Sequence, residues 1–151
     1  MRLLFEGFVR NFYRIEQKEF AVGREDIKWL AEEVTTGAKA FLPIMRTDIS
    51  LESKERKIII DTKFSKETLQ DHFGKKSVKS DNLYQLFSYM MNCACKGGIH
   101  EHCEGILLYP SVDSTPPLRY MIHGHKVSVR TINLNQDWRD IHRDLLGLLS
   151  N

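Results

Sequence analysis

The heptapeptide Ile58-Ile-Ile-Asp-Thr-Lys-Phe64 is the most strand-like run in this chain. It opens with three isoleucines, and β-branched side chains favour the pleated, half-buried surface of a sheet. A second strand-like run, Ile44-Met-Arg-Thr-Asp-Ile-Ser-Leu51, precedes it across a short charged turn. We therefore predict that residues 44–64 form a hairpin of two central strands.

Helical patterns lie on both sides of this hairpin. In residues 3–19, apolar residues recur every three to four positions with charged residues between them, which is typical of an amphipathic helix. The predicted helices are residues 3–19, a segment from the Ser80-Asp81 cap to about residue 93, and a last helix capped by Asn135 or Asp137. Residues 65–80 are polar and rich in lysine, and we predict a short helix that passes into a loop.

Further strands are predicted before and after the hairpin. Residues 27–34 favour a first strand, and residues 106–109 favour another that ends at Pro110. Residues 118–132 have the pattern of a hairpin that turns near Gly124. The order α-β-β-β-α-β-β-β-α predicts a mixed α/β fold, with residues 1–151 in a single domain.

Composition excludes several classes of protein. The chain has 151 residues, of which 42% are hydrophobic and 28% charged, and its net charge is +2. These values exclude a disordered chain, a collagen-like repeat and a disulfide-dense miniprotein. No apolar run approaches the roughly 18 residues of a membrane span, and residues 1–8 lack a signal peptide's apolar region. We expect a cytoplasmic protein without a membrane partner.

The two strands of the hairpin carry the residues that point to chemistry. Alternation along a strand places Asp61 and Lys63 on one face, and the partner strand brings Asp48 close to them. Carboxylates gathered at the end of apolar strands repel each other, and a divalent cation removes that repulsion. Mg²⁺ takes oxygen ligands from one or two carboxylates, so we predict Mg²⁺ here, with Mn²⁺ as a substitute.

Hydrolysis of a phosphodiester matches this set of residues. Asp48 and Asp61 would hold the metal ion and Lys63 would orient the nucleophile or stabilise the transition state. Glu6, on the first helix, is a further predicted metal ligand. The alternative is that Asp61 and Lys63 form an exposed ion pair, which is the commoner meaning of an isolated D-x-K motif.

Several motifs in order carry a resemblance to a known family. They are residues 4–8, Leu42-Pro-Ile-Met-Arg-Thr-Asp-Ile-Ser-Leu51, residues 58–64, Asn82-Leu-Tyr-Gln-Leu-Phe-Ser-Tyr89, residues 105–110 and residues 129–134. Together they resemble the nuclease domain of the McrC subunit of the McrBC 5-methylcytosine restriction system. That family belongs to the PD-(D/E)xK nuclease superfamily.

The resemblance implies a restriction-endonuclease-like core, a mixed sheet flanked by helices. It also implies that Asp48 is the first acid, Asp61 the second acid and Lys63 the lysine of the catalytic motif. Gln85 and Tyr89 match a QxxxY element, and residues four apart share one face of a helix. The wider superfamily often has proline directly before the first acid, whereas this chain has Thr47 there.

The resemblance also implies partners. The resemblance implies that members of the family are longer proteins, whose amino-terminal part engages a GTP-driven, McrB-like AAA+ GTPase. We expect that region to be absent from this chain. The sequence contains no G-x-x-x-x-G-K-[ST] phosphate loop, so we expect GTP hydrolysis and recognition of the modified cytosine to belong to the partner. This chain would then cut the DNA.

Lysines beside the predicted site are suited to the phosphate backbone of DNA, which cationic side chains bind without reading its sequence. They are Lys66, Lys75, Lys76 and Lys79. A solvated surface loop is an equally good interpretation of these four lysines. The sequence does not decide whether the protein forms a dimer that could cut both strands of DNA.

Three further alternatives are left open by the sequence. Zinc could be held by a cluster of Cys93, Cys95, His100, His102 and Cys103, although buried thiols and surface histidines are the better interpretation. A stand-alone nuclease of the same superfamily, acting in repair or defence, is a second alternative. A catalytically silent module for DNA binding or assembly is the third.

Overall fold

The computed structural model describes residues 1–64, 80–114 and 116–150. The first half of the chain forms α1 (Arg2–Glu16), β1 (Ala21–Gly23), β2 (Asp26–Ile27), the 3-10 helix η1 (Ala38–Phe41), β3 (Met45–Arg46), β4 (Ile49–Glu52) and β5 (Lys57–Thr62). The second half forms α3 (Ser80–Ala94), the 3-10 helix η2 (Gly98–His100), β6 (Glu104–Ser111), β7 (Leu118–Ile122), β8 (His125–Asn133) and α4 (Trp138–Gly147).

A six-stranded mixed sheet in the order β1-β4-β5-β6-β8-β7 is the centre of the molecule. β4 pairs antiparallel with β5, and β5 pairs in parallel with β6, which in turn pairs in parallel with β8. β5 is therefore a central strand, and its six residues are all buried. The carboxyl ends of β5, β6 and β8 lie at the same edge of the sheet.

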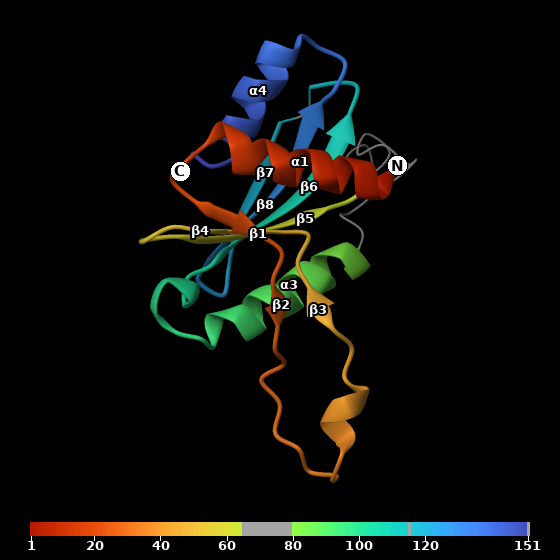
Figure 1. The fold of residues 1–151 in the computed structure, drawn as a ribbon, viewed down its shortest axis with the longest axis vertical. Coiled ribbons are helices and arrows are strands. Elements are labelled where there is room, and N and C mark those ends of the chain that lie inside the picture. Colours follow the sequence, from red (N-terminus) through yellow and green to blue (C-terminus); the bar gives the residue numbers. More distant parts are fainter. Residues whose placement is uncertain (65–79, 115, 151) are drawn as a thin grey trace.

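Helices cover both faces of this sheet. Figure 1 shows α1 and α4 on one side and α3 on the other. Alternate residues of β5 accordingly enter two separate cores, with Ile58 and Ile60 facing α1 and α4 while Ile59 faces α3. The predicted mixed α/β class is confirmed, and the arrangement is consistent with a restriction-endonuclease-like core.

Several local predictions are also confirmed. The hairpin of residues 118–132 turns at His123 and Gly124, which both have positive φ (48° and 81°), as a two-residue turn between twisted strands requires. Asp137, rather than Asn135, caps the last helix, because its side chain accepts a hydrogen bond of 2.9 Å from the Arg139 N–H. The first helix ends at Glu16, three residues before the predicted end.

The predicted first strand at residues 27–34 is wrong. Only Asp26–Ile27 is extended and paired, as β2, with β3. Beyond Ile27, hydrogen bonds between side chains and the backbone take the place of backbone pairing between strands. The Leu30 N–H donates to Asn92 Oδ1, and the Trp29 indole donates to the Pro43 carbonyl.

The predicted strand at residues 44–51 is interrupted. Met45–Arg46 pairs with β2, the chain bends at Thr47 and Asp48, and only residues 49–52 pair with β5. At the bend, the Thr47 N–H donates to the Glu25 carbonyl instead of a neighbouring strand. The hairpin prediction therefore holds for its inner part, β4 and β5.

Pro110 does not end its strand as predicted. It lies inside β6, paired with Ile132 of β8. The Leu108 carbonyl faces β5, where it accepts from the Lys63 N–H, and a residue two positions later faces the same way. Pro110 is thus directed past the last residue of β5, where its missing N–H breaks no ladder hydrogen bond.

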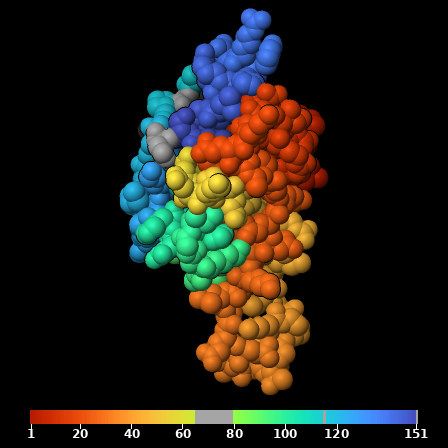
Figure 2. Space-filling view, turned by 60° about the vertical axis from the view of Figure 1, so that its left-hand side comes forward, coloured from red at the N-terminus to blue at the C-terminus, as the bar shows by residue number. Residues whose placement is uncertain are grey.

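A narrow arm formed by residues 26–46 projects from the body of the protein. Figures 1 and 2 show it extending well beyond the sheet and helices, with η1 at its outer part. Its exposed apolar side chains include Leu30, Val34, Phe41 and Ile44. The returning side of the arm leads directly into Thr47 and Asp48. No helix in the described part of the chain is both long and apolar enough to cross a membrane.

Candidate active site

The two predicted acids meet at the edge of the sheet where β5 ends. Ile49 of β4 pairs with Ile60 of β5, and continuing this antiparallel register by one residue places Asp48 opposite Asp61. Directly opposite residues of an antiparallel pair point to the same face. Asp61 follows Ile59 on the α3 face of β5, and the Asp48 carboxylate at the bend lies close enough to raise the Asp61 pKa. The structure thus brings together the pair that the sequence predicted.

Asp48 is held by hydrogen bonds from the strand that carries Asp61. Its Oδ2 accepts from the Thr62 backbone N–H at 2.8 Å and from the Thr62 hydroxyl at 2.9 Å. The Asp48 side chain and backbone together are only 6% exposed. These contacts fix the carboxylate at the bend between β3 and β4.

Asp61 is a buried carboxylate that forms an ion pair with Lys63. It is 3% exposed, and Lys63 Nζ lies 2.8 Å from its Oδ2 as an ion pair. This oxygen is itself buried, and the Lys63 ammonium is the cation that faces it. Burial raises the pKa of Asp61 to about 7, and the Asp48 carboxylate adds to the rise although Lys63 opposes it. Folding therefore makes the negative charge of this carboxylate unfavourable.

Gln85 and Tyr89 reach the acids through Lys63. Lys63 Nζ donates to Gln85 Oε1 at 2.6 Å, and Gln85 Nε2 donates to the Tyr89 hydroxyl at 2.9 Å. Tyr89 is buried against the sheet, whereas Gln85, one turn earlier on α3, is exposed and contacts Lys63. Burial raises the pKa of Tyr89, and the charges of Asp61 and Asp48 raise it further, so its phenol keeps its proton.

Glu6 lies near the acids but is bound to arginines. It is 2% exposed, and its Oε1 is 2.8 Å from Arg10 NH1 and 3.6 Å from Arg24 Nε. Sequence reasoning did not assign a role to either arginine. The spacing of four between Glu6 and Arg10 on a helix is the signal that could have paired them.

Two features of the site can be compared with the needs of a magnesium ion. Among the described residues, no group of three or more His, Cys, Asp or Glu side chains is arranged to hold a metal ion. Mg²⁺, however, commonly takes one or two protein carboxylates and completes its shell with water and phosphate oxygens. The buried Asp61 carboxylate, which lies close enough to the Asp48 carboxylate for the latter to raise its pKa, fits that donor set.

Other predicted residues lie apart from the acids or outside the described residues. The four lysines predicted to bind DNA, Lys66, Lys75, Lys76 and Lys79, fall in the segment 65–79, which the structure does not describe. In the cysteine cluster, Cys93 and Cys103 are buried and Cys95 is exposed. The described residues of that cluster form no metal-binding group, so nothing in this structure favours zinc there.

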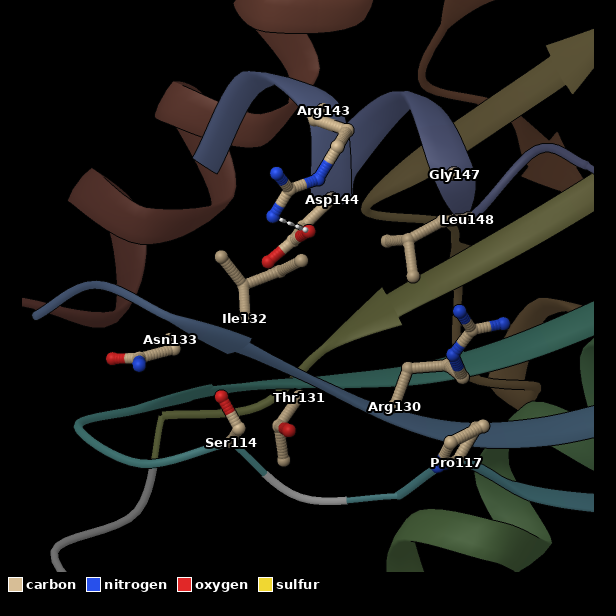
Figure 3. Close-up of a pocket in the computed structure, with 10 residues that line it drawn as sticks. All are labelled: Ser114, Pro117, Arg130, Thr131, Ile132, Asn133, Arg143, Asp144, Gly147 and Leu148. Carbon is tan, nitrogen blue, oxygen red and sulfur yellow. Dashed lines mark hydrogen bonds and ion pairs between the residues drawn. The ribbon is translucent and has the colours of Figure 1, made fainter. Parts of the chain in front are cut away.

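A cavity of about 370 Å³ lies between the end of β8 and α4 (Figure 3). Its lining includes Arg130, Asn133 and Asp144, and Figure 3 shows the ion pair between Arg143 and Asp144 at its wall. None of the predicted catalytic residues lines it. The candidate active site therefore rests on the side chains at the end of β5 and not on this cavity.

Comparison with known proteins places the chain in a family. A family model described as a McrBC 5-methylcytosine restriction system component matches residues 1–110. The chain belongs to the McrBC family. The match spans the residues predicted to be catalytic: Asp48, Asp61, Lys63, Gln85 and Tyr89.

A curated McrBC relative gives the same result. The type IV methyl-directed restriction enzyme EcoKMcrBC of Escherichia coli strain K12 is 35% identical over 148 residues. That similarity covers 98% of this chain, and the chain spans 42% of the relative's length. The resemblance predicted from the sequence motifs is confirmed at the level of the family.

Proposed function

We propose that this chain is the part of a McrBC-type restriction system that cuts DNA, as a Mg²⁺-dependent endonuclease. The observation that carries the proposal is the meeting of two buried carboxylates, Asp48 and Asp61, with the Lys63 ammonium 2.8 Å from Asp61 Oδ2. One lysine offsets the charge of one carboxylate, so a second buried carboxylate beside it is unfavourable without a further cation. A divalent cation held by the two carboxylates would remove this repulsion.

In this proposal Asp48 and Asp61 hold the ion. When bound, Mg²⁺ lowers the pKa of a water ligand and neutralises charge that develops on the phosphate. Asp48 keeps its place through Thr62, and a positive charge beside Asp61 favours loss of the Asp61 proton. Mn²⁺, which also accepts oxygen ligands, would substitute.

Lys63, Gln85 and Tyr89 act on the substrate side. The Lys63 ammonium has three N–H groups, of which one faces Asp61 and one is donated to Gln85. The third can orient the attacking water or bind a phosphate oxygen. Gln85 fixes the direction of Lys63, and Tyr89 fixes Gln85 in turn. Tyr89 accepts from Gln85, which leaves its own hydroxyl proton available to a phosphate oxygen.

We propose that a McrB-like AAA+ GTPase supplies the recognition of modified cytosine and the control by GTP. The support is the family to which this chain belongs and the methyl-directed restriction enzyme to which it is similar. The chain has no phosphate-loop motif of its own. Cleavage that waits for the partner would protect unmodified DNA.

Cleavage of methylated plasmid DNA tests the proposal. The wild-type chain, Asp61→Asn and Lys63→Met are compared with Mg²⁺ or EDTA, and with or without the partner GTPase and GTP. Asp140→Asn is the matched control, because it also removes a carboxylate paired with a cation, but on α4, where its side chain is 42% exposed. We expect cutting by wild type and control only with Mg²⁺, and its loss in the two site variants.

The other outcomes separate the alternatives. Cutting that needs Mg²⁺ and Asp61 but neither partner nor GTP indicates a stand-alone nuclease. DNA binding that is the same in wild type and Asp61→Asn, with no cutting in any condition, indicates a silent binding module and refutes the proposal.

A further inference from the structure

Glu6 anchors two arginines that reach the backbone beside the first acid. Arg10 NH1 lies 2.8 Å from Glu6 Oε1 and donates at 3.0 Å to the carbonyl of Asp48. Arg24 lies on the other side, with its Nε 3.6 Å from the same Glu6 oxygen and 3.4 Å from the carbonyl of Thr47. One buried carboxylate thus connects to two consecutive carbonyls of the bend.

Those carbonyls need donors because of where they lie. Thr47 and Asp48 fall between β3 and β4, outside either strand, so the sheet ladder does not pair them. Buried backbone carbonyls are almost always hydrogen-bonded in folded proteins. The guanidinium groups of Arg10 and Arg24 supply what the interrupted strand cannot.

We propose that Glu6 is a positioning residue for Asp48, acting through Arg10 and Arg24, and not itself a ligand of the metal ion. The inference rests on the proposed function for its consequence, which is the affinity of the acids for metal. Glu6 Oε1 is the oxygen that both arginines approach. The carboxylate keeps the guanidiniums in place, and they hold the Asp48 backbone so that its side chain stays opposite Asp61.

Replacing Glu6 or Arg10 should make the position of Asp48 less fixed even without metal. The Thr62 N–H donates to Asp48 Oδ2, so the exchange of this amide proton reports how firmly the carboxylate is held. In EDTA, we expect Glu6→Gln and Arg10→Gln to raise the Thr62 exchange rate by at least about threefold relative to wild type. Arg14→Gln is the matched control, because it removes an arginine from the same helix at an exposed position.

Metal affinity is the second readout. Loss of groups that orient a metal ligand commonly reduces metal affinity by about 10- to 100-fold. We expect Glu6→Gln and Arg10→Gln each to weaken Mn²⁺ binding about tenfold by titration calorimetry. Raising the Mg²⁺ concentration should restore cleavage to Arg10→Gln but not to Asp61→Asn, because only the latter lacks a ligand. Arg14→Gln should behave as wild type throughout.

A direct ligand role for Glu6 gives a different pattern. Glu6→Gln would then weaken Mn²⁺ binding while Arg10→Gln would not, and neither would change Thr62 exchange in EDTA. That pattern overturns the inference, as does a wild-type exchange rate in both variants. If Glu6→Gln does not fold, Arg10→Gln alone decides by the same criteria.

The same experiments distinguish failure of the proposed function from failure of this inference. Wild type would then neither bind Mn²⁺ nor cut DNA, whereas the exchange measurement in EDTA would still show whether Glu6 positions Asp48.

Discussion

Replacing Asp61 by asparagine should make the metal-free protein more stable while it abolishes cleavage. Burial and the neighbouring Asp48 raise the pKa of Asp61 from 3.8 to about 7. Such a rise corresponds to roughly 4 kcal/mol of destabilisation once the group is charged. Asparagine has almost the same shape and no charge. The pKa already includes the attraction of Lys63, and since an asparagine amide reproduces the contacts of a protonated aspartate only in part, we expect a net stabilisation of about 2 kcal/mol.

The raised pKa of Asp61 determines how the stability difference between wild type and Asp61→Asn changes with pH. In the folded protein Asp61 keeps its proton up to about pH 7, whereas in the unfolded chain it loses it near 3.8. The folded state therefore binds more protons between these values, and wild-type stability falls as the pH rises through this window. The advantage of Asp61→Asn should be absent below pH 3.8, grow from there to about pH 7 and then level off.

Thermal unfolding in EDTA, measured from pH 4 to pH 8, is the assay. For a domain of this size, about 2 kcal/mol corresponds to a melting temperature roughly 4–8 °C higher. Added Mg²⁺ should reverse the order, since it stabilises only the protein that can bind it. A variant that is less stable than wild type at pH 8, or a difference that does not change with pH, would refute the reasoning.

Three further predictions concern the framework of the site. Gly105→Ala should lower stability by about 1–3 kcal/mol in urea unfolding, because a Cβ there meets the sulfur of Met90 on α3. Asp137→Ala should lower the stability measured by thermal unfolding by about 1 kcal/mol through loss of the α4 cap. Lys57→Met should cost about 1–2 kcal/mol, since it removes the lysine 2.6 Å from the one-fifth-exposed Glu25 while Lys96 still pairs with that carboxylate, and adding Glu25→Gln should recover part of that stability in a double-mutant cycle.

Much of the fold was predictable because local patterns and tertiary packing agree. The apolar stripes of α1 and α3, the isoleucines of β5 and the turn at Gly124 each specify an element that the whole structure also favours. The prediction for residues 27–34 was wrong because their apolar side chains suggest burial, whereas Leu30 and Val34 are exposed on the arm. Periodicity cannot show which apolar segments remain in solvent.

The site was predictable in part for a similar reason. Asp48, Asp61 and Lys63 come from one hairpin, so alternation and register suffice to bring them together. The arginines that hold the Asp48 backbone could not be found in that way. Arg24 reaches the site from the loop after β1, and no periodic pattern indicates how such a loop is placed.

The interrupted hairpin also bears on how the protein folds. The hydrogen bond from Thr62 to Asp48 spans 14 residues, whereas those from Lys63 to Gln85 and from Arg10 to Asp48 span 22 and 38. Shorter loops close with less loss of chain entropy, so the pair of acids can form as soon as β4 and β5 associate. The groups that orient the acids are added as the helices dock on each face. Substitutions in β4 and β5 should therefore slow folding, whereas substitutions at the helix contacts should mainly speed unfolding.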